Sequence, residues 1–243
     1  KVRPVAHTLQ QHGTVIGLCS DKSVSAIQHW AQYFGFGGPI IAERGALLLD
    51  APTADALHLG PWALYFEQLR ARLHSALPED VGIEVLTGDP TEILKQSLLL
   101  PPLLTRLVVL NTLRRTSLSL STRARMADET TIDLSLLTLV EQVLRDCVEM
   151  FPPDFLYYWD VNPEYGSIIM GAEEATKRLG AQHLLGRLPS ERVVMIGDTM
   201  SDFVDDPRVE QWAVANASPE YRARCTAVAA SEFTPGVEEL LRT

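Results

Sequence analysis

The segment Arg192-Val-Val-Met-Ile-Gly-Asp-Thr-Met-Ser-Asp202 places a short apolar run directly before a glycine and an aspartate. An uninterrupted apolar run of this length is typical of a strand buried in a parallel sheet. Because ligands of open α/β sheets bind at the carboxyl ends of strands, Asp198 is expected at such an end, with Asp202 one turn beyond. Two converging carboxylates suit Mg²⁺, which prefers hard oxygen ligands. The alternative is a helix N-cap at Asp198 and a solvated first-turn acid at Asp202.

A second segment, Leu18-Cys-Ser-Asp-Lys-Ser23, follows another apolar run and opens a predicted helix. A serine at this position, next to free backbone N–H groups, is suited to hold a phosphate oxygen, and a lysine there adds positive charge. We therefore take Ser20, Asp21 and Lys22 as candidate phosphate-binding residues. An ordinary helix cap is the alternative interpretation.

Helical and apolar strand patterns alternate over both ends of the chain. This alternation predicts a doubly wound α/β sheet, with helices on both faces of parallel strands. The predicted helices cover residues 2–11, the segment after Ser23, 171–179 and 237–241, and the predicted strands cover 14–19, 39–42, 46–49, 192–196, 212–215 and 227–230.

The middle of the chain has a different pattern, in which Thr116-Ser-Leu-Ser-Leu-Ser121 alternates polar and apolar residues as a half-exposed antiparallel strand does. We predict an inserted α+β cap domain at about residues 54–162, and a core made of 1–53 and 163–243. The apolar segment 98–104 is predicted to lie in the interior of the cap. The predicted cap elements are helices at 62–77 and 131–150 and strands at 107–110, 116–121 and 156–161.

Composition excludes several functions. The 243 residues carry a net charge of −10, which argues against nucleic acid or an anionic membrane as the main partner. No apolar run approaches the ~18 residues that a membrane span requires. Cys19, Cys147 and Cys225 are odd in number and lack zinc-ligand spacing, so we expect free thiols in a reducing cytoplasm.

Taken together, these segments resemble haloacid dehalogenase-like (HAD) phosphatases, and among them the Cof-type enzymes with a type IIB α/β cap. Gly197-Asp-Thr-Met-Ser-Asp202 is similar to the family's GDxxND-like acids, with serine where asparagine is common. Ala213-Val-Ala-Asn-Ala217 is similar to its "NA" strand end, and Phe233-Thr-Pro-Gly-Val-Glu-Glu-Leu240 to its late helix. Ile40-Ile-Ala-Glu-Arg-Gly-Ala46 resembles its I-x-E/N-x-G-A strand pair. The resemblance spans nearly the whole chain and is most specific at 192–217.

The resemblance implies an Mg²⁺-dependent phosphatase that acts on a small phosphorylated metabolite through an aspartyl-phosphate. Asp198 corresponds to the family's metal-binding aspartate, and Asp202 is implied to bind the metal through water or to support it. Ser20 corresponds to the hydroxyl that holds the transferring phosphoryl group, and Asn216 is a further phosphate-binding candidate. Candidates for an anionic substrate group in the cap are Arg114 and Arg115, with solvated surface arginines as the alternative.

The sequence departs from the family pattern in two places. The nucleophile motif D-x-D-x-T is absent, and we expect it on a strand upstream of the helix at 2–11. The family's phosphate-neutralising lysine is expected near Met170, and Lys177 lies about 10 Å of helix further on. Lys22 is therefore the predicted substitute. The alternatives are a catalytically impaired HAD-like binding or regulatory domain, and a phosphomutase or phosphotransferase on the same scaffold.

Overall fold

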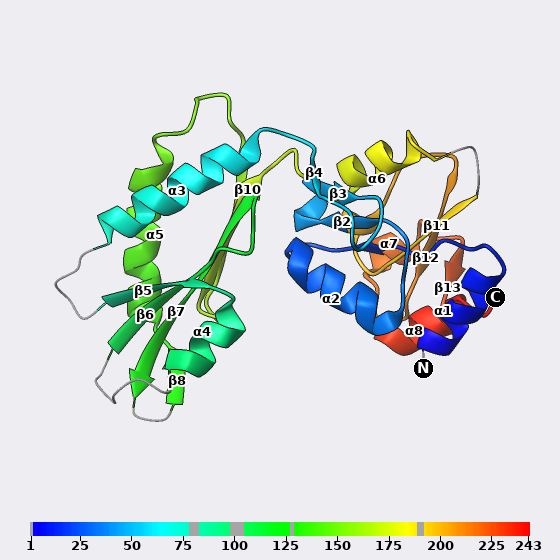
Figure 1. Cartoon of the computed structure of the whole chain (residues 1–243), viewed down its shortest axis with the longest axis horizontal. Coiled ribbons are helices and arrows are strands. Elements are labelled where there is room, and N and C mark those ends of the chain that lie inside the picture. Colours follow the sequence, from blue (N-terminus) through cyan, green and yellow to red (C-terminus); the bar gives the residue numbers. More distant parts are fainter. Residues whose placement is uncertain (1, 78–82, 98–104, 127–128, 189–191) are drawn as a thin grey trace. The chain divides into compact units, whose positions relative to one another are not determined.

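The computed structural model describes residues 2–77, 83–97, 105–126, 129–188 and 192–243. The chain divides into two compact units, one made of Lys1–Leu59 with Ala175–Thr243 and the other of Gly60–Glu174 (Figure 1). We call them the core unit and the cap unit. The cap unit covers residues 60–174, whereas the sequence predicted 54–162. The later end arises because a further strand, residues 167–172, belongs to the cap sheet.

The core unit contains two separate sets of strands. In the first set, β1 and β2 are parallel and β3 and β4 continue antiparallel; in the second, β11, β12 and β13 are all parallel. The bounds are β1 (Leu18–Cys19), β2 (Ile40–Ala42), β3 (Leu47–Leu49), β4 (Leu57–His58), β11 (Val193–Gly197), β12 (Val209–Ala213) and β13 (Ala227–Val228).

Helices pack on both faces of these strands because successive strand residues point to opposite sides. Leu47 and Leu49 lie in one apolar cluster with residues of α1 and α2, whereas Leu48 lies in another with residues of α6. Helix α8 contacts α1. The helices of the core unit are α1 (Val2–Gln11), α2 (Val24–Phe34), α6 (Lys177–Leu185), α7 (Pro219–Arg222) and α8 (Phe233–Leu240), and the short 3-10 turns are η1 (Glu43–Gly45) and η3 (Met200–Asp202).

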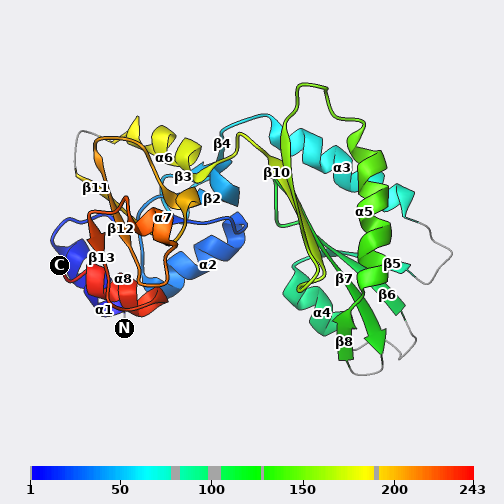
Figure 2. The ribbon, with the colours of Figure 1, turned by 180° about the vertical axis from the view of Figure 1, so that it is seen from behind.

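The cap unit is a mixed sheet in the order β5-β6-β7-β10-β9, with β8 paired to β7. Helices α3 and α5 lie on one side of this sheet and α4 on the other (Figure 2). The predicted fold class, a doubly wound α/β core with an inserted α+β domain, is confirmed. The elements are α3 (Trp62–Ala76), β5 (Ile83–Gly88), α4 (Pro90–Ser97), β6 (Thr105–Asn111), β7 (Ser117–Met126), β8 (Glu129–Ile132), α5 (Leu134–Val148), β9 (Tyr157–Asn162) and β10 (Ser167–Ala172).

The helix predicted at 171–179 is wrong. This segment begins with the last two residues of β10, which pairs antiparallel with both β7 and β9. Met170 of this strand is fully buried opposite Leu118 and Trp159. The next helix starts only at Lys177, after Thr176 accepts a hydrogen bond from a backbone N–H as its N-cap. The segment 98–104, predicted to lie in the interior of the cap, is outside the described residues. Among the residues that are described, no helix is long and apolar enough to cross a membrane.

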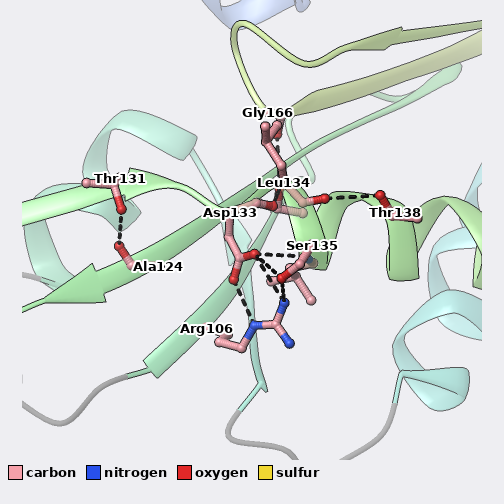
Figure 3. Close-up of polar contacts among 10 residues, drawn as sticks. Arg106, Ala124, Thr131, Asp133, Leu134, Ser135, Thr138 and Gly166 are labelled. Atoms are coloured by element: carbon pink, nitrogen blue, oxygen red, sulfur yellow. Dashed lines mark hydrogen bonds and ion pairs between the residues drawn. The ribbon is translucent and has the colours of Figure 1, made fainter.

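Asp133 joins the start of α5 to the cap sheet (Figure 3). Its carboxylate accepts two hydrogen bonds from Arg106, at 2.7 and 3.1 Å, and one each from the Leu136 N–H and the Ser135 hydroxyl, both at 2.8 Å. The hydrogen bond from Arg106, with smaller contributions from Leu136 and Ser135, lowers the pKa of Asp133 to about 2. This carboxylate therefore caps α5 and also ties the start of that helix to β6 through its ion pair with Arg106.

We expect Asp133→Asn to lower the free energy of unfolding by about 2 kcal/mol at pH 7. Because the folded pKa is depressed to about 2, the contribution is complete above the unfolded pKa near 4 and is lost as the pH falls toward 2. Urea unfolding at pH 7, 5, 3 and 2 measures it. The control is Asp146→Asn, which changes an exposed acid of the same helix. Equal losses in both variants, or an Asp133→Asn deficit that persists at pH 2, would contradict this assignment.

Candidate active site

Lys177 joins the two segments that the sequence singled out. Its Nζ lies 2.8 Å from Asp202 Oδ1, after β11, and 3.6 Å from Asp21 Oδ1, after β1. The Lys177 side chain is 11% exposed and the Asp202 side chain 8%, so this ion pair is largely removed from water. The carboxyl ends of β1 and β11 therefore form one site around a shared ammonium group.

The prediction that Lys177 lies too far from the site is wrong. It assumed a helix that begins near Gly171, whereas α6 begins at Lys177 itself. Met170, the position where a lysine was expected, belongs to the cap sheet. Among the described residues, Lys177 is the lysine that contacts Asp202 and Asp21. The phosphate-binding role of Lys22 stays a prediction. The Lys22 side chain is exposed, and its backbone N–H donates to Ser20 Oγ at 3.3 Å.

Two glycines allow the start of α6 to approach η1. Gly45 has φ +103°, and a Cβ there would overlap the carbonyl group of Thr176. A Cβ on Gly180 would lie 2.5 Å from Ile41 Cγ2 and 3.2 Å from the Cα of Gly45. Sequence reasoning did not assign either glycine to the site, although Gly45 lies in the quoted Glu-Arg-Gly-Ala segment. Their close approach fixes the position of the Lys177 backbone.

Asp202 uses both of its carboxylate oxygens inside the protein. Oδ1 accepts from Lys177, and Oδ2 accepts from the backbone N–H groups of Asp198, at 3.0 Å, and Thr199, at 3.2 Å. Burial alone would raise the pKa of Asp202, but the Lys177 charge and these hydrogen bonds together lower it. Asp202 thus closes the turn after β11 and orients Lys177, and its predicted role toward a metal stays a prediction.

Asp198 is an exposed residue directly after β11. Its backbone is held on both sides, because its N–H donates to Asp202 and its carbonyl accepts from Ser218 N–H at 2.8 Å. Partial burial, followed by the neighbouring charge of Asp202, raises the pKa of Asp198. A bound cation would offset this crowding of negative charge.

The donor set at Asp198 fits Mg²⁺ as one part of a coordination shell. Within the described ranges, no three His, Cys, Asp or Glu side chains are grouped so as to hold a metal ion. Mg²⁺ usually takes one or two carboxylates and keeps several waters, so a single exposed carboxylate is a suitable ligand. The remaining protein ligands would have to come from another segment.

The structure places the other phosphate-binding candidates at the same end of the core strands. Ser20 directly follows β1, and its N–H donates to the Ile41 carbonyl at 3.0 Å. Asn216 Oδ1 accepts from the Phe233 N–H at 2.8 Å, which holds the start of α8. The phosphate-binding roles of both residues stay predictions. Cys19 is a poor nucleophile, because burial raises the pKa of its thiol to about 12.

The two arginine candidates differ in their surroundings in the cap unit. Arg114 is 7% exposed, and its Nη1 donates to Ser117 Oγ at 3.2 Å. Its Nε has no hydrogen-bond partner among the residues that the structure describes. The alternative of a solvated surface arginine is therefore wrong for Arg114, whereas Arg115 is exposed. A contact with substrate stays a prediction for both.

Comparison with known proteins identifies the fold through structure alone. No family model matches the sequence, and no curated protein matches it either. A haloacid dehalogenase-like hydrolase from Bacteroides thetaiotaomicron has a TM-score of 0.64 and 15% identity over 99% of this chain and 90% of its own. A HAD/COF-like hydrolase from Plasmodium vivax has a TM-score of 0.55 and 15% identity, over 99% and 86%.

A trehalose-6-phosphate phosphatase related protein gives a TM-score of 0.55 at 10% identity, over 99% of this chain and 85% of its own. The chain therefore has the fold of HAD-like hydrolases, and the resemblance inferred from its motifs is confirmed at the level of the fold. Within that class, the HAD/COF-like neighbour agrees with the Cof-type pattern of the sequence.

Proposed function

We propose that this protein is an Mg²⁺-dependent phosphatase of a small phosphorylated metabolite. The observation that carries the proposal is the buried Lys177–Asp202 ion pair beside the exposed Asp198, at the carboxyl ends of β1 and β11. Catalysis of phosphoryl transfer depends mainly on positioning and on neutralising the charge of the phosphate oxygens. A preorganised ammonium group next to a carboxylate suited to Mg²⁺ supplies both requirements.

Each residue of the site has one role in this reaction. Lys177 donates to a phosphate oxygen and neutralises charge, and Asp202 positions Lys177. Ser20 donates its hydroxyl to a second phosphate oxygen. Asp198 would hold Mg²⁺, which would add positive charge at the phosphoryl group.

The nucleophile is an aspartate supplied from outside residues 1–243, as the resemblance implies. One of its oxygens bonds to phosphorus while the ester P–O bond breaks, and the leaving oxygen takes a proton from the second aspartate of the same motif. Water then attacks phosphorus and gives a proton to the second aspartate, and the aspartyl–phosphate bond breaks to release inorganic phosphate and the free nucleophile.

The charges at the site support a requirement for a divalent cation. The carboxylates of Asp21 and Asp202 contact the Lys177 ammonium group, and the same charge acts on Asp198. A phosphate monoester brings up to two further negative charges, and the nucleophile brings another. Without a cation, binding the substrate would require like charges to approach one another.

The cysteines and the net charge support a cytoplasmic location and argue against a polyanionic partner. All three cysteines are free thiols, as is usual in a reducing compartment. The net charge of −10 makes nucleic acid or an anionic membrane an unsuitable main partner.

We expect Asp198→Asn to reduce Mg²⁺-dependent hydrolysis at least about 100-fold, because the metal loses its carboxylate ligand. The measurement uses the full-length protein and a panel of phosphate esters, with Mg²⁺ and with chelator. The control is Asp205→Asn, an exposed aspartate in the loop that follows η3. No Mg²⁺-dependent turnover would favour a non-catalytic HAD-like domain, and transfer to an added acceptor in preference to water would favour a phosphotransferase.

A further inference from the structure

A pocket of about 180 Å³ opens in the cap unit, where the chain enters and leaves that unit. Trp62 lines it close to the first boundary, at Gly60, and Glu174 lines it at the last residue of the unit. A cavity of similar volume holds one molecule of benzene. The pocket therefore suits a small ligand or one small group of a larger ligand.

Aromatic residues form one part of the lining. Tyr65, on α3, and Phe155, in the loop before β9, meet edge to face with their ring centroids 4.9 Å apart. Phe155 meets Phe151 in the same way at 4.8 Å. Trp62 is the third aromatic residue of the lining and is only 4% exposed. Because these rings pack on one another, they are held in place before a ligand arrives, which lowers the entropic cost of binding.

Two carboxylates form the other part of the lining and give the pocket a negative charge. Asp154 and Glu174 are both exposed, and neither has a hydrogen bond or an ion pair within the described ranges. Among the lining residues that the structure describes, none is basic. Two like charges beside one cavity create a negative potential that attracts a cation.

Backbone hydrogen bonds bring the two acids to the same pocket. The Phe155 N–H donates to the Pro152 carbonyl at 2.9 Å, which closes the turn that carries the first acid. The Glu173 N–H donates to the Leu156 carbonyl at 3.0 Å, which ties this turn to the end of β10, next to the second acid. The two carboxylates are thus set on a connected backbone rather than on independent loops.

We propose that this pocket binds the organic ammonium group of a small molecule. Aromatic rings attract weakly hydrated cations, and carboxylates without a cationic partner add to that attraction. Mg²⁺ fits less well, because it demands octahedral oxygen coordination and dehydrates reluctantly. An anion would meet two carboxylates. We call the site the ammonium pocket, and its assignment does not depend on the proposed phosphatase function.

Nuclear magnetic resonance of the full-length protein tests the proposal, with tetramethylammonium as the probe. We expect saturable shifts of the Trp62 indole N–H and of the Phe155 and Glu174 backbone N–H groups, with a dissociation constant below about 10 mM. The indole N–H of Trp212, in the core unit, is the internal control. The matched probe is tert-butanol, a neutral molecule of nearly the same shape, which is expected to bind at least about fivefold more weakly.

A variant with both Asp154→Asn and Glu174→Gln is expected to weaken the binding of tetramethylammonium at least about fivefold. Both acids are exposed, so these substitutions leave the fold intact. The control is Asp160→Asn, which changes an exposed acid of β9 that does not line the pocket. Its effect is expected to stay below about twofold.

Three results would each overturn the proposal. The first is the absence of saturable shifts at the three named N–H groups. The second is equal binding of tert-butanol, which would make the pocket a site for neutral apolar groups. The third is unchanged binding in the double variant. Displacement of tetramethylammonium by Mg²⁺ at the same N–H groups would overturn it in favour of a metal site.

Discussion

Replacing Lys177 with methionine is expected to lower kcat/KM of the full-length protein for a phosphate ester by about 100- to 1,000-fold. The same change is expected to lower the free energy of unfolding by about 3 kcal/mol, because it leaves the buried Asp202 carboxylate without its cationic partner. Hydrolysis rates and urea unfolding measure the two effects. Both originate from one ammonium group, which stabilises the turn after β11 and which the proposed function assigns to a phosphate oxygen.

Two controls separate this role from a general loss of positive charge. Arg178→Met removes an exposed cation one residue further along the same helix and is expected to change stability by less than about 0.5 kcal/mol. A double-mutant cycle with Asp202→Asn is expected to give a coupling energy of at least about 1 kcal/mol. Additive effects of the two substitutions would show that Lys177 and Asp202 do not act as a pair. If the Lys177→Met variant hydrolysed the ester at the wild-type rate, Lys177 would have no role in the reaction.

Several elements of the core were predictable because local sequence determines them. The helix at 2–11 was predicted with its observed bounds. The apolar run before Gly197 predicted β11, and the two aspartates that follow it lie at the strand end as expected. In each case the pattern lies within a few residues of the element. Any apolar surface packed against the helix at 2–11 or against β11 would have given the same element, so the rest of the fold did not change these two predictions.

The lysine of the site was misplaced because a distant contact decides where α6 begins. A short apolar run such as that of β10 fits a strand or a buried helix equally well. Pairing with β7, which is distant in sequence, and with β9, which precedes it through the turn 163–166, makes it a strand. The helix start then moves to Lys177. The approach of Gly45 to Thr176 is a long-range contact of the same kind, which residue patterns do not reveal.

This approach makes Gly45→Ala the second large expected effect. Gly45 has φ +103°, a conformation that residues with a Cβ rarely adopt, and the added carbon would overlap the Thr176 carbonyl group. Strain and overlap are each expected to cost about 1 to 3 kcal/mol. We therefore expect the free energy of unfolding to fall by at least about 2 kcal/mol. Urea unfolding of residues 1–243 measures it.

Gly13→Ala is the matched control, because Gly13 also has a positive φ, +90°, but no atom lies within 4 Å of its added Cβ. The loss of unfolding free energy in Gly13→Ala measures the backbone strain alone. Any larger loss in Gly45→Ala measures the added overlap with the residue before α6. Because Thr176 is the N-cap that precedes Lys177, the displaced helix should also weaken the Lys177–Asp202 pair. The coupling energy of that pair, measured again in the Gly45→Ala background, is therefore expected to fall by at least half. Equal losses in the two glycine variants, with an unchanged coupling energy, would show that Gly45 does not position the lysine.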